Sequence, residues 1–257
     1  MTPVAISPLY NELLLTAAQR DRITVVLVNP RNPLNIGAVA RAMANFGFSH
    51  LSVVGAYEPL WREARSAVGA PELLANAREH ATLSEAVTQQ TLVLGTGTLT
   101  YRKPDQTVIS LPALGPLIHP ELARKGRVAI LFGSEKRGLS REDLSYCHAL
   151  VEIPTDQRQP SMNLGQAAAV CLYELACGNA RITDEPSPSP TAIDSATLER
   201  LGDLIQQTMI AADYSPESMH ETNRHDLRVL LRRLNFSPLD ARRILGLFRR
   251  ILTRLTK

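Results

Sequence analysis

Short runs of β-branched and aliphatic residues recur along the first part of the chain, with polar segments between them. Each run is mostly continuous rather than alternating, which is typical of strands that are covered on both faces. Segments with helical spacing separate the runs, so the pattern predicts an α/β fold with a mainly parallel sheet and helices on both faces. The predicted strands are ITVVLV (23–28), HLSVV (50–54), TLVLGT (91–96), RVAILFG (127–133) and ALVEIP (149–154).

Three helices are predicted between or after these strands. Segments 36–46 and 163–177 have apolar residues at helical spacing, and each stops before a glycine, the residue that most easily ends a helix. Segment 140–147 begins with Ser140 and Asp143, whose spacing is that of a capping box. Predicted strands and helices therefore alternate along the chain as far as residue 177.

A stretch rich in proline and serine, residues 181–195, breaks this alternation and is interpreted as a linker. Three amphipathic helices are predicted beyond it. The second should bury Leu227, Leu230, Leu231 and Leu234 and expose Arg224, Arg228 and Arg232. The third should start at Ser237, bury Ile244, Leu245, Phe248, Ile251 and Leu252, and expose Arg242, Arg243, Arg249 and Arg250. The predicted organisation is an N-terminal extension (1–21), an α/β domain (22–180), the linker (181–195) and a small all-α domain (196–257).

The composition is that of a soluble protein, with 44% hydrophobic and 21% charged residues. No segment is apolar for long enough to cross a membrane, and the first residues do not have the pattern of a signal peptide. The three cysteines form no CxxC pair, and the histidines lack the spacing of a metal site, so no metal is expected. A reducing cytoplasm is the expected location.

Charge is distributed unevenly along the chain. From residue 222 to the end, ten basic residues stand against two acidic ones, which gives this tail a net charge of +8 and leaves −5 for the rest of the chain. A charge separation of this kind suggests that the tail binds a polyanion.

The predicted strands end in segments rich in glycine and polar residues. Ligands of parallel α/β sheets bind at the carboxyl ends of the strands, so four such segments indicate one constructed site. Neither a dinucleotide fingerprint nor a P-loop is present, which weighs against a nucleotide-dependent metabolic enzyme. Leu131, Ile153, Met162 and Leu164 are expected to form apolar walls around an adenine ring. The segments are 29–35, 95–98, 133–138 and 155–163.

Three ordered motifs stand in or beside these segments. They are Asn29-Pro30 with Asn35, Gly37 and Ala40-Arg41-Ala42; Phe132-Gly133-Ser134-Glu135 with Gly138-Leu139; and Ile153-Pro154 with Ser161-Met162-Asn163-Leu164. Together they resemble the motifs of the SPOUT superfamily of RNA methyltransferases, in its 2′-O-ribose branch. The resemblance covers about residues 22–178, and the C-terminal tail is similar to the helical extension of members that methylate nucleotide 32 of the tRNA anticodon loop.

The resemblance implies a C-terminal trefoil knot in the α/β domain, an obligate homodimer with a catalytic centre completed across the interface, S-adenosylmethionine as cofactor and tRNA as partner. The cofactor residues that it implies are Thr96, Gly97, Thr98, Gly133, Ile153, Ser161, Met162 and Asn163. The implied catalytic residues are Arg41, Asn35, Glu135, Ser161 and Asn163. Together with the basic tail, it implies RNA contacts by Arg41, Arg224, Arg228, Arg232, Arg242 and Arg243.

The chemistry of methyl transfer to a ribose hydroxyl fits these residue types. The reaction needs alignment of the reacting atoms and a route for the hydroxyl proton. The fork of Arg41 suits a phosphate beside the target ribose, and its high pKa favours orientation over proton abstraction. Asn35 and Asn163 could also be helix caps, a role that is compatible with one in the site. Glu135 is expected either to hold a neighbouring loop or to be an ordinary surface acid. The identity of the proton acceptor is left open.

Two other functions are compatible with the sequence. The first is 2′-O-methylation of another tRNA position or of ribosomal RNA. The second is a non-catalytic dimeric protein in which only the basic helices bind RNA. Binding of S-adenosylmethionine separates the second from a methyltransferase.

Overall fold

One parallel sheet organises the α/β part of the molecule. The computed structural model describes residues 15–57, 59–97, 104–177, 193–234 and 236–256. Within them, seven parallel strands lie in the order β3-β2-β1-β6-β4-β7-β5. Their bounds are β1 (Ile23–Val28), β2 (His50–Val54), β3 (Arg78–His80), β4 (Leu92–Thr96), β5 (Thr107–Ser110), β6 (Val128–Phe132) and β7 (Ala149–Glu152). The predicted α/β fold is confirmed.

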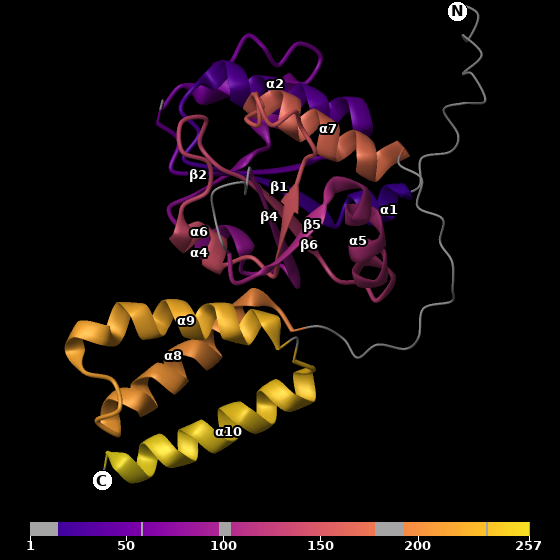
Figure 1. The fold of residues 1–257 in the computed structure, drawn as a ribbon. Coiled ribbons are helices and arrows are strands. Elements are labelled where there is room, and N and C mark those ends of the chain that lie inside the picture. The colour runs from indigo at the N-terminus through magenta and orange to yellow at the C-terminus, as the bar shows by residue number, and fades with distance from the viewer. Residues whose placement is uncertain (1–14, 58, 98–103, 178–192, 235, 257) are drawn as a thin grey trace, which may run out of the picture.

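Helices cover both faces of this sheet (Figure 1). One face carries α2 and α7, which pack against each other, with α3 and α5 beside them; the other face carries α4 and α6. The bounds are α1 (Ala17–Arg20), α2 (Pro33–Phe46), α3 (Pro71–Ala75), α4 (Leu83–Val87), α5 (Leu114–Ala123), α6 (Arg141–Ser145) and α7 (Leu164–Cys177). Short 3-10 helices are η2 (Trp61–Glu63) and η3 (Leu111–Ala113).

The central strands are mostly apolar because each contributes to two cores. In β1, Val25 and Leu27 face the core beneath α2 and α7, while Val26 and Val28 face the core beneath α4 and α6. Successive side chains of a strand point to opposite faces, so a strand buried on both sides loses the alternation of apolar and polar positions. All six residues of β1 are buried.

Two strands were not predicted, and both are short: β3 has a polar sequence, and β5 has only two apolar residues. The residues of β3, Arg78–His80, are exposed or half-buried at one edge of the sheet. At the opposite edge, the Thr107–Ser110 strand β5 is also largely exposed. An edge strand buries little side-chain surface, so pairing with β2 or β7 defines these two strands, and no apolar run marks them.

The helix ends follow local chemistry. Helix α2 begins three residues earlier than predicted, with Pro33 in its first turn and the Asn32 side chain accepting a hydrogen bond from the N–H of Leu34. It ends as predicted at Gly47, which adopts the left-handed conformation with φ of 74°. Helix α6 is shorter than predicted, but its capping box is present.

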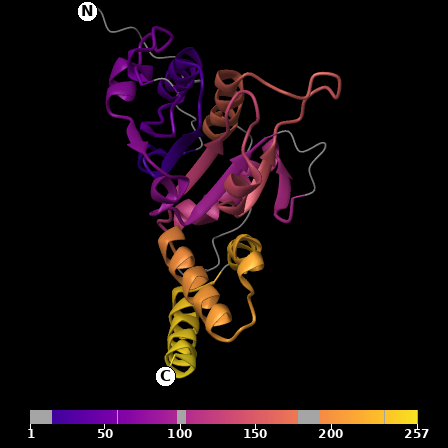
Figure 2. The same cartoon turned by 90° about the vertical axis from the view of Figure 1, so that its left-hand side faces the viewer.

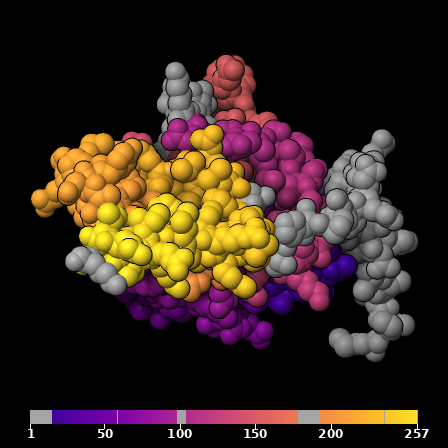
Figure 3. Space-filling model, turned by 90° about the horizontal axis from the view of Figure 1, so that it is seen from below, coloured from indigo at the N-terminus to yellow at the C-terminus, as the bar shows by residue number. Residues whose placement is uncertain are grey.

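Three further helices follow the α/β part: α8 (Ser195–Ala211), α9 (His220–Arg233) and α10 (Pro238–Leu255), with η4 (Glu217–Met219) before α9. They share a small core that includes Leu198, Leu201 and Leu231. Helix α8 contacts α4, and helix α9 contacts α6. Figure 2 shows the three helices below the α/β part, and Figure 3 shows α10 in front of it when the molecule is seen from below. Residues 1–14 of the predicted extension and 181–192 of the predicted linker lie outside the described residues.

The predicted orientation of α9 is correct for Leu231, which is buried, and for Arg224, which is exposed, but it is wrong for four other residues. Leu230 and Leu234, expected in the core, are 46% and 52% exposed, whereas Arg228 and Arg232 are buried. Helix α9 packs on α6 of the α/β part as well as on α8, so more than one face of the helix is covered. Helix α10 buries its apolar residues only partly, and Ile251 is exposed.

Candidate active site

The carboxyl ends of β1, β6, β4 and β7 lie side by side, because these four strands are neighbours in the sheet and all run in the same direction. The polar segments that follow them therefore meet at one edge. The structure thus brings together the strand ends from which the sequence predicted a site.

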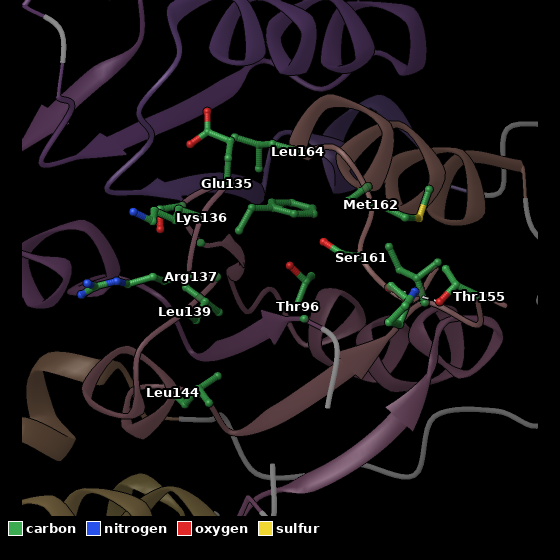
Figure 4. A pocket seen from close by; sticks show the side chains of 18 residues that line it. Thr96, Glu135, Lys136, Arg137, Leu139, Leu144, Thr155, Ser161, Met162 and Leu164 are labelled. Atoms are coloured by element: carbon green, nitrogen blue, oxygen red, sulfur yellow. Dashed lines mark hydrogen bonds between the residues drawn. The ribbon is translucent and has the colours of Figure 1, made fainter. Parts of the chain in front are cut away.

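A pocket of about 350 Å³ opens between the segments after β4, β6 and β7 (Figure 4). Its apolar walls come from the side chains Leu139, Leu144, Ile153, Met162 and Leu164. Its polar lining includes the side chains Glu135, Lys136, Arg137, Thr155 and Ser161. A pocket of this size, in which apolar walls and polar groups converge, is suited to a small molecule.

Most of the predicted cofactor residues line this pocket: Thr96, Gly97, Gly133, Ile153, Ser161 and Met162 do so. Thr98 lies outside the described residues. Leu131, expected as an apolar wall, is instead fully buried in the core beneath α4 and α6. It lies within a strand, and the pocket lies beyond the strand ends. The Thr96 hydroxyl donates a hydrogen bond of 2.8 Å to the Leu131 carbonyl, so it is engaged within the fold.

The sequence prediction placed segments 133–138 and 155–163 at the site but did not name Lys136, Arg137 or Thr155 among the binding residues. Leu144, on α6, was not predicted to line it. A usable signal existed in the GSEKRGLS segment, where two basic residues stand between two glycines directly after a buried strand.

The segment after β6 folds back tightly on itself. A β-carbon at Gly133 would overlap the backbone of Gly138 and Leu139, so only glycine fits there. Gly138 has a φ of 66° and donates its N–H to the Ser134 carbonyl at 2.8 Å. This closed turn holds the side chains between the two glycines at the mouth of the pocket.

Glu135 links this turn to the segment after β1. Its carboxylate accepts hydrogen bonds from the N–H groups of Arg31 at 2.9 Å and Asn32 at 3.0 Å, and from Nδ2 of Asn35 at 2.8 Å. Nδ2 of Asn163 in turn donates to Oδ1 of Asn35 at 2.9 Å. The three predicted residues Glu135, Asn35 and Asn163 therefore form one continuous network at the rim of the pocket.

The network explains the ionisation of Glu135. Partial burial acts to raise the pKa of this carboxyl, but hydrogen bonds from the Asn35 side chain and from the backbone N–H groups of Glu135, Arg31 and Asn32 outweigh it and hold the pKa below its ordinary value. Glu135 is thus an ionised clamp. It is poorly suited to take up a proton.

Asn163 does not line the pocket. Its Oδ1 accepts the N–H of Gly165 at 2.9 Å, as a cap at the start of α7. The capping role and the link to Asn35 coexist in one side chain, because its oxygen and nitrogen serve different partners.

Arg41 does not line the pocket either. It lies on α2, six residues after Asn35, which corresponds to about 9 Å along the helix axis. Its side chain is exposed, and within the described part of the chain it forms no hydrogen bond or ion pair. Leu34, Val170 and Tyr173 on α2 and α7 are also exposed, at 54%, 36% and 54%.

The basic residues predicted to contact RNA fall into different environments. Arg242 and Arg243 are exposed on α10, and Arg224 is exposed but paired with Asp203 at 3.1 Å. The prediction is wrong for Arg228 and Arg232, which are only 7% and 3% exposed. Both guanidinium groups pack against the ring of Tyr146 and pair with Glu199.

Two further properties concern the described residues alone. They contain no group of three or more His, Cys, Asp or Glu side chains placed to hold a metal ion. No helix among them combines the length and apolar character needed to cross a membrane.

Comparison with known proteins places this site in a family. Residues 22–173 match the SpoU rRNA Methylase family. The chain is 39% identical over 155 residues to the tRNA (cytidine-2'-O-)-methyltransferase TrmJ of Methanocaldococcus jannaschii, covering 60% of this chain and 66% of that protein. It is 39% identical over 165 residues to the tRNA (cytidine/uridine/adenosine-2'-O-)-methyltransferase TrmJ of Pseudomonas aeruginosa, covering 60% of each. The matched part is thus less than two thirds of the length of these two relatives.

A solved structure extends the likeness beyond the α/β part. The crystal structure of TrmJ from Z. mobilis ZM4 is 27% identical and superposes with a TM-score of 0.76, covering 91% of this chain and 99% of that one. The family match spans the strands whose ends form the pocket and all the residues of the Glu135 network. The chain therefore belongs to the SpoU rRNA Methylase family.

Proposed function

We propose that this chain transfers a methyl group from S-adenosylmethionine to the 2′-hydroxyl of a ribose in tRNA, at cytidine or uridine 32 of the anticodon loop. The observation that carries the proposal is the pocket at the ends of β4, β6 and β7, with the linked Glu135, Asn35 and Asn163 at its rim. The names of the M. jannaschii and P. aeruginosa relatives support tRNA as the substrate.

The pocket lining fits S-adenosylmethionine chemically. Leu139, Leu144 and Ile153 offer apolar surface for an adenine ring, and Glu135, Ser161 and Lys136 offer charged or polar groups for the amino-acid end. When bound, the cofactor supplies an electrophilic methyl group. The residues that would hold it are Thr96, Gly97, Gly133, Ile153, Ser161 and Met162, with Asn163 at the start of α7 and Thr98 next to Gly97.

The protein's own contribution is alignment and charge. The Glu135 network fixes the start of α2 against the segment after β6, and a rigid rim of this kind holds reacting groups in position. Arg41 contacts the phosphate next to the target ribose, because a guanidinium binds phosphate in a bidentate manner. A guanidinium stays protonated in proteins, so the acceptor of the hydroxyl proton is another group.

We further propose that two copies of the chain share the site. Arg41 is exposed on α2, and exposed apolar residues lie on the same helix (Leu34) and on α7, which packs against it (Val170 and Tyr173). Pairing of this face with a second copy would cover the apolar residues and carry Arg41 of one copy to the pocket of the other. The trefoil knot around the segments after β6 and β7 is part of the same proposal, and the exclusion of any side chain at Gly133 supports it.

The primary test measures methyl transfer and cofactor binding separately. Purified protein is incubated with tRNA and S-adenosylmethionine, and the modified nucleotide is mapped by mass spectrometry. Arg41→Ala should lower turnover by at least about a hundredfold and leave cofactor affinity unchanged, whereas the control Asn45→Ala, exposed one turn further along α2, should retain both. Absence of cofactor binding by the wild type would favour a non-catalytic RNA-binding protein. Methylation of a different nucleotide would refute position 32.

A second test asks whether each site is completed by residues from both copies of the chain. Arg41→Ala and Ser161→Ala should each be inactive as homodimers. Co-expressed chains that carry one substitution each should regain activity, because one of the two sites in a mixed dimer receives both intact residues. No recovery in a verified mixed dimer would contradict a site completed across the interface.

A further inference from the structure

The segments after β1 and β2 are held firmly together beside the pocket. The N–H of Asn29 donates to the Val54 carbonyl at 2.8 Å, and the N–H of Tyr57 donates to the Pro30 carbonyl at 3.1 Å. Asn29 itself has a φ of 51°, a left-handed conformation that turns the chain sharply. The next residue but one, Arg31, donates its N–H to the carboxylate of Glu135. The two segments are therefore fixed to each other and to the rim of the pocket.

An arginine and a tyrosine stack on the surface of this junction. The guanidinium carbon of Arg31 lies 4.9 Å from the centroid of the Tyr57 ring, a cation–π geometry. Tyr57 is 66% exposed, Arg31 is exposed as well, and within the described residues neither side chain forms a hydrogen bond or an ion pair. Two flat groups that could be covered by a partner thus remain open to solvent on an anchored backbone.

The other cation–π pairs among the described residues have a different environment. Arg62 packs over Trp61, and Arg228 and Arg232 pack over Tyr146; both rings are buried within the fold. In those pairs the aromatic ring contributes to the core. The ring of Tyr57 contributes no comparable burial, so folding alone does not account for its position.

We propose that Arg31 and Tyr57 form a platform on which a base of the substrate RNA stacks, next to the nucleotide whose ribose is methylated. This inference rests on the proposed function. Bases in RNA loops are readily splayed out and stack on aromatic rings or guanidinium planes. The platform is one hydrogen bond from Glu135, which lines the pocket, so it lies close to where the ribose must bind. Lys136, also at the pocket, adds positive charge for the RNA backbone.

The test uses the full-length protein and a tRNA anticodon stem-loop, with single abasic nucleotides introduced in turn around the loop. Tyr57→Ala should raise the KM for RNA roughly tenfold or more, as expected for loss of one stacked base, with kcat and cofactor affinity little changed. Tyr57→Phe should restore the wild-type KM, because it keeps the ring. Tyr214→Ala, which removes a 75% exposed tyrosine after α8, is the matched control and should have no effect.

The abasic substrates separate stacking from a merely structural role. At one loop position, removal of the base should raise the KM of the wild type for RNA. The same abasic RNA should not raise the KM of Tyr57→Ala beyond the value that this variant has for the intact RNA. An unchanged KM in Tyr57→Ala, or additive losses at every loop position, would overturn the platform. A shift of Tyr57→Ala from dimer to monomer in sedimentation, with RNA binding retained, would also overturn it and identify a contact between protein copies. If the wild type methylates no RNA, the proposed function fails. The affinities of the wild type and Tyr57→Ala for the intact and abasic RNAs, measured by fluorescence anisotropy, still decide whether the platform binds a base.

Discussion

Two arginines of α9 and the arginines of α10 have the same chemistry but opposite environments. On α9, Arg228 and Arg232 are almost fully buried and stack against Tyr146, with ring distances of 4.1 and 5.2 Å. On α10 the arginines are exposed and, within the described residues, form no side-chain hydrogen bond or ion pair; they are Arg242, Arg243, Arg249, Arg250 and Arg254. One set of arginines therefore builds the protein, and the other is available to a polyanion.

The buried set joins the C-terminal helices to the α/β part. Arg228 pairs with Glu142 and donates to the Ser145 hydroxyl at 3.0 Å, both on α6. Arg232 donates to the Tyr146 carbonyl at 2.8 Å, and to Glu199 of α8 at 2.9 Å. Burial of these charges is tolerated because Arg228 donates from Nε and Nη1, and Arg232 donates from all three guanidinium nitrogens. Net charge counted along a sequence overstates the charge that a tail offers to RNA.

The largest effect is expected from breaking the buried set. Arg232→Ala leaves Glu199 with one partner fewer and removes a stacked group, so it should lower the free energy of unfolding by about 3–5 kcal/mol. Urea unfolding at neutral pH measures this. Arg233→Ala, the exposed neighbour, is the control and should change stability by less than about 0.5 kcal/mol. Equal stability of the two variants would show that α9 is not fixed through Arg232.

The exposed set should respond in the opposite way. Replacing Arg242 and Arg243 together by alanine should weaken tRNA binding about tenfold and reduce the slope of log affinity against log salt by about 1.4–1.8, as expected for two lost phosphate contacts. Stability should stay within about 0.5 kcal/mol of the wild type, because both side chains are exposed. Filter binding over a salt series measures affinity and slope. An unchanged slope would mean that α10 does not contact phosphates.

This contrast also marks the limit of prediction from sequence. The strands β1 and β2 match their predicted ranges because an apolar run is a local property of the chain. The environment of Arg228 depends on Glu142, 86 residues away, and no periodicity within α9 contains that information. The Glu135 network likewise joins residues about a hundred positions apart. The motifs predicted which residues belong to the site, and only the folded chain reveals how they are connected.

A smaller effect is expected from acid in the same buried region. Desolvation and the nearby charge of Arg232 lower the pKa of His148 to about 3, and its Nδ1 accepts the N–H of Val93 at 3.0 Å. The ring is neutral when folded, whereas the unfolded chain takes up a proton below about pH 6.5. The contribution of the neutral His148 ring to the free energy of unfolding is therefore complete above pH 6.5. It is lost as the pH falls towards 3, by at most about 1.4 kcal/mol per pH unit.

His148→Asn tests this dependence, because the Asn side chain can keep an acceptor for the Val93 N–H and does not titrate. Urea unfolding at pH 7.5 and pH 5.5 should show a loss of stability that is about 1 kcal/mol larger for the wild type than for the variant. Equal losses in both proteins would assign the acid sensitivity to other groups.

The smallest effect on stability is expected at Arg224, which lies between the two sets. Its pair with Asp203 is 57% and 48% exposed, so Arg224→Ala should cost less than about 0.5 kcal/mol. The change in tRNA affinity on substitution of Arg224 decides whether this residue belongs with the structural or the RNA-binding arginines. If Arg224 faces tRNA, Asp203→Asn removes a competing carboxylate and strengthens binding, while Arg224→Ala weakens it, each by about two- to threefold at low salt. Identical tRNA affinity in both variants would place Arg224 with the structural arginines of α9 despite its exposure.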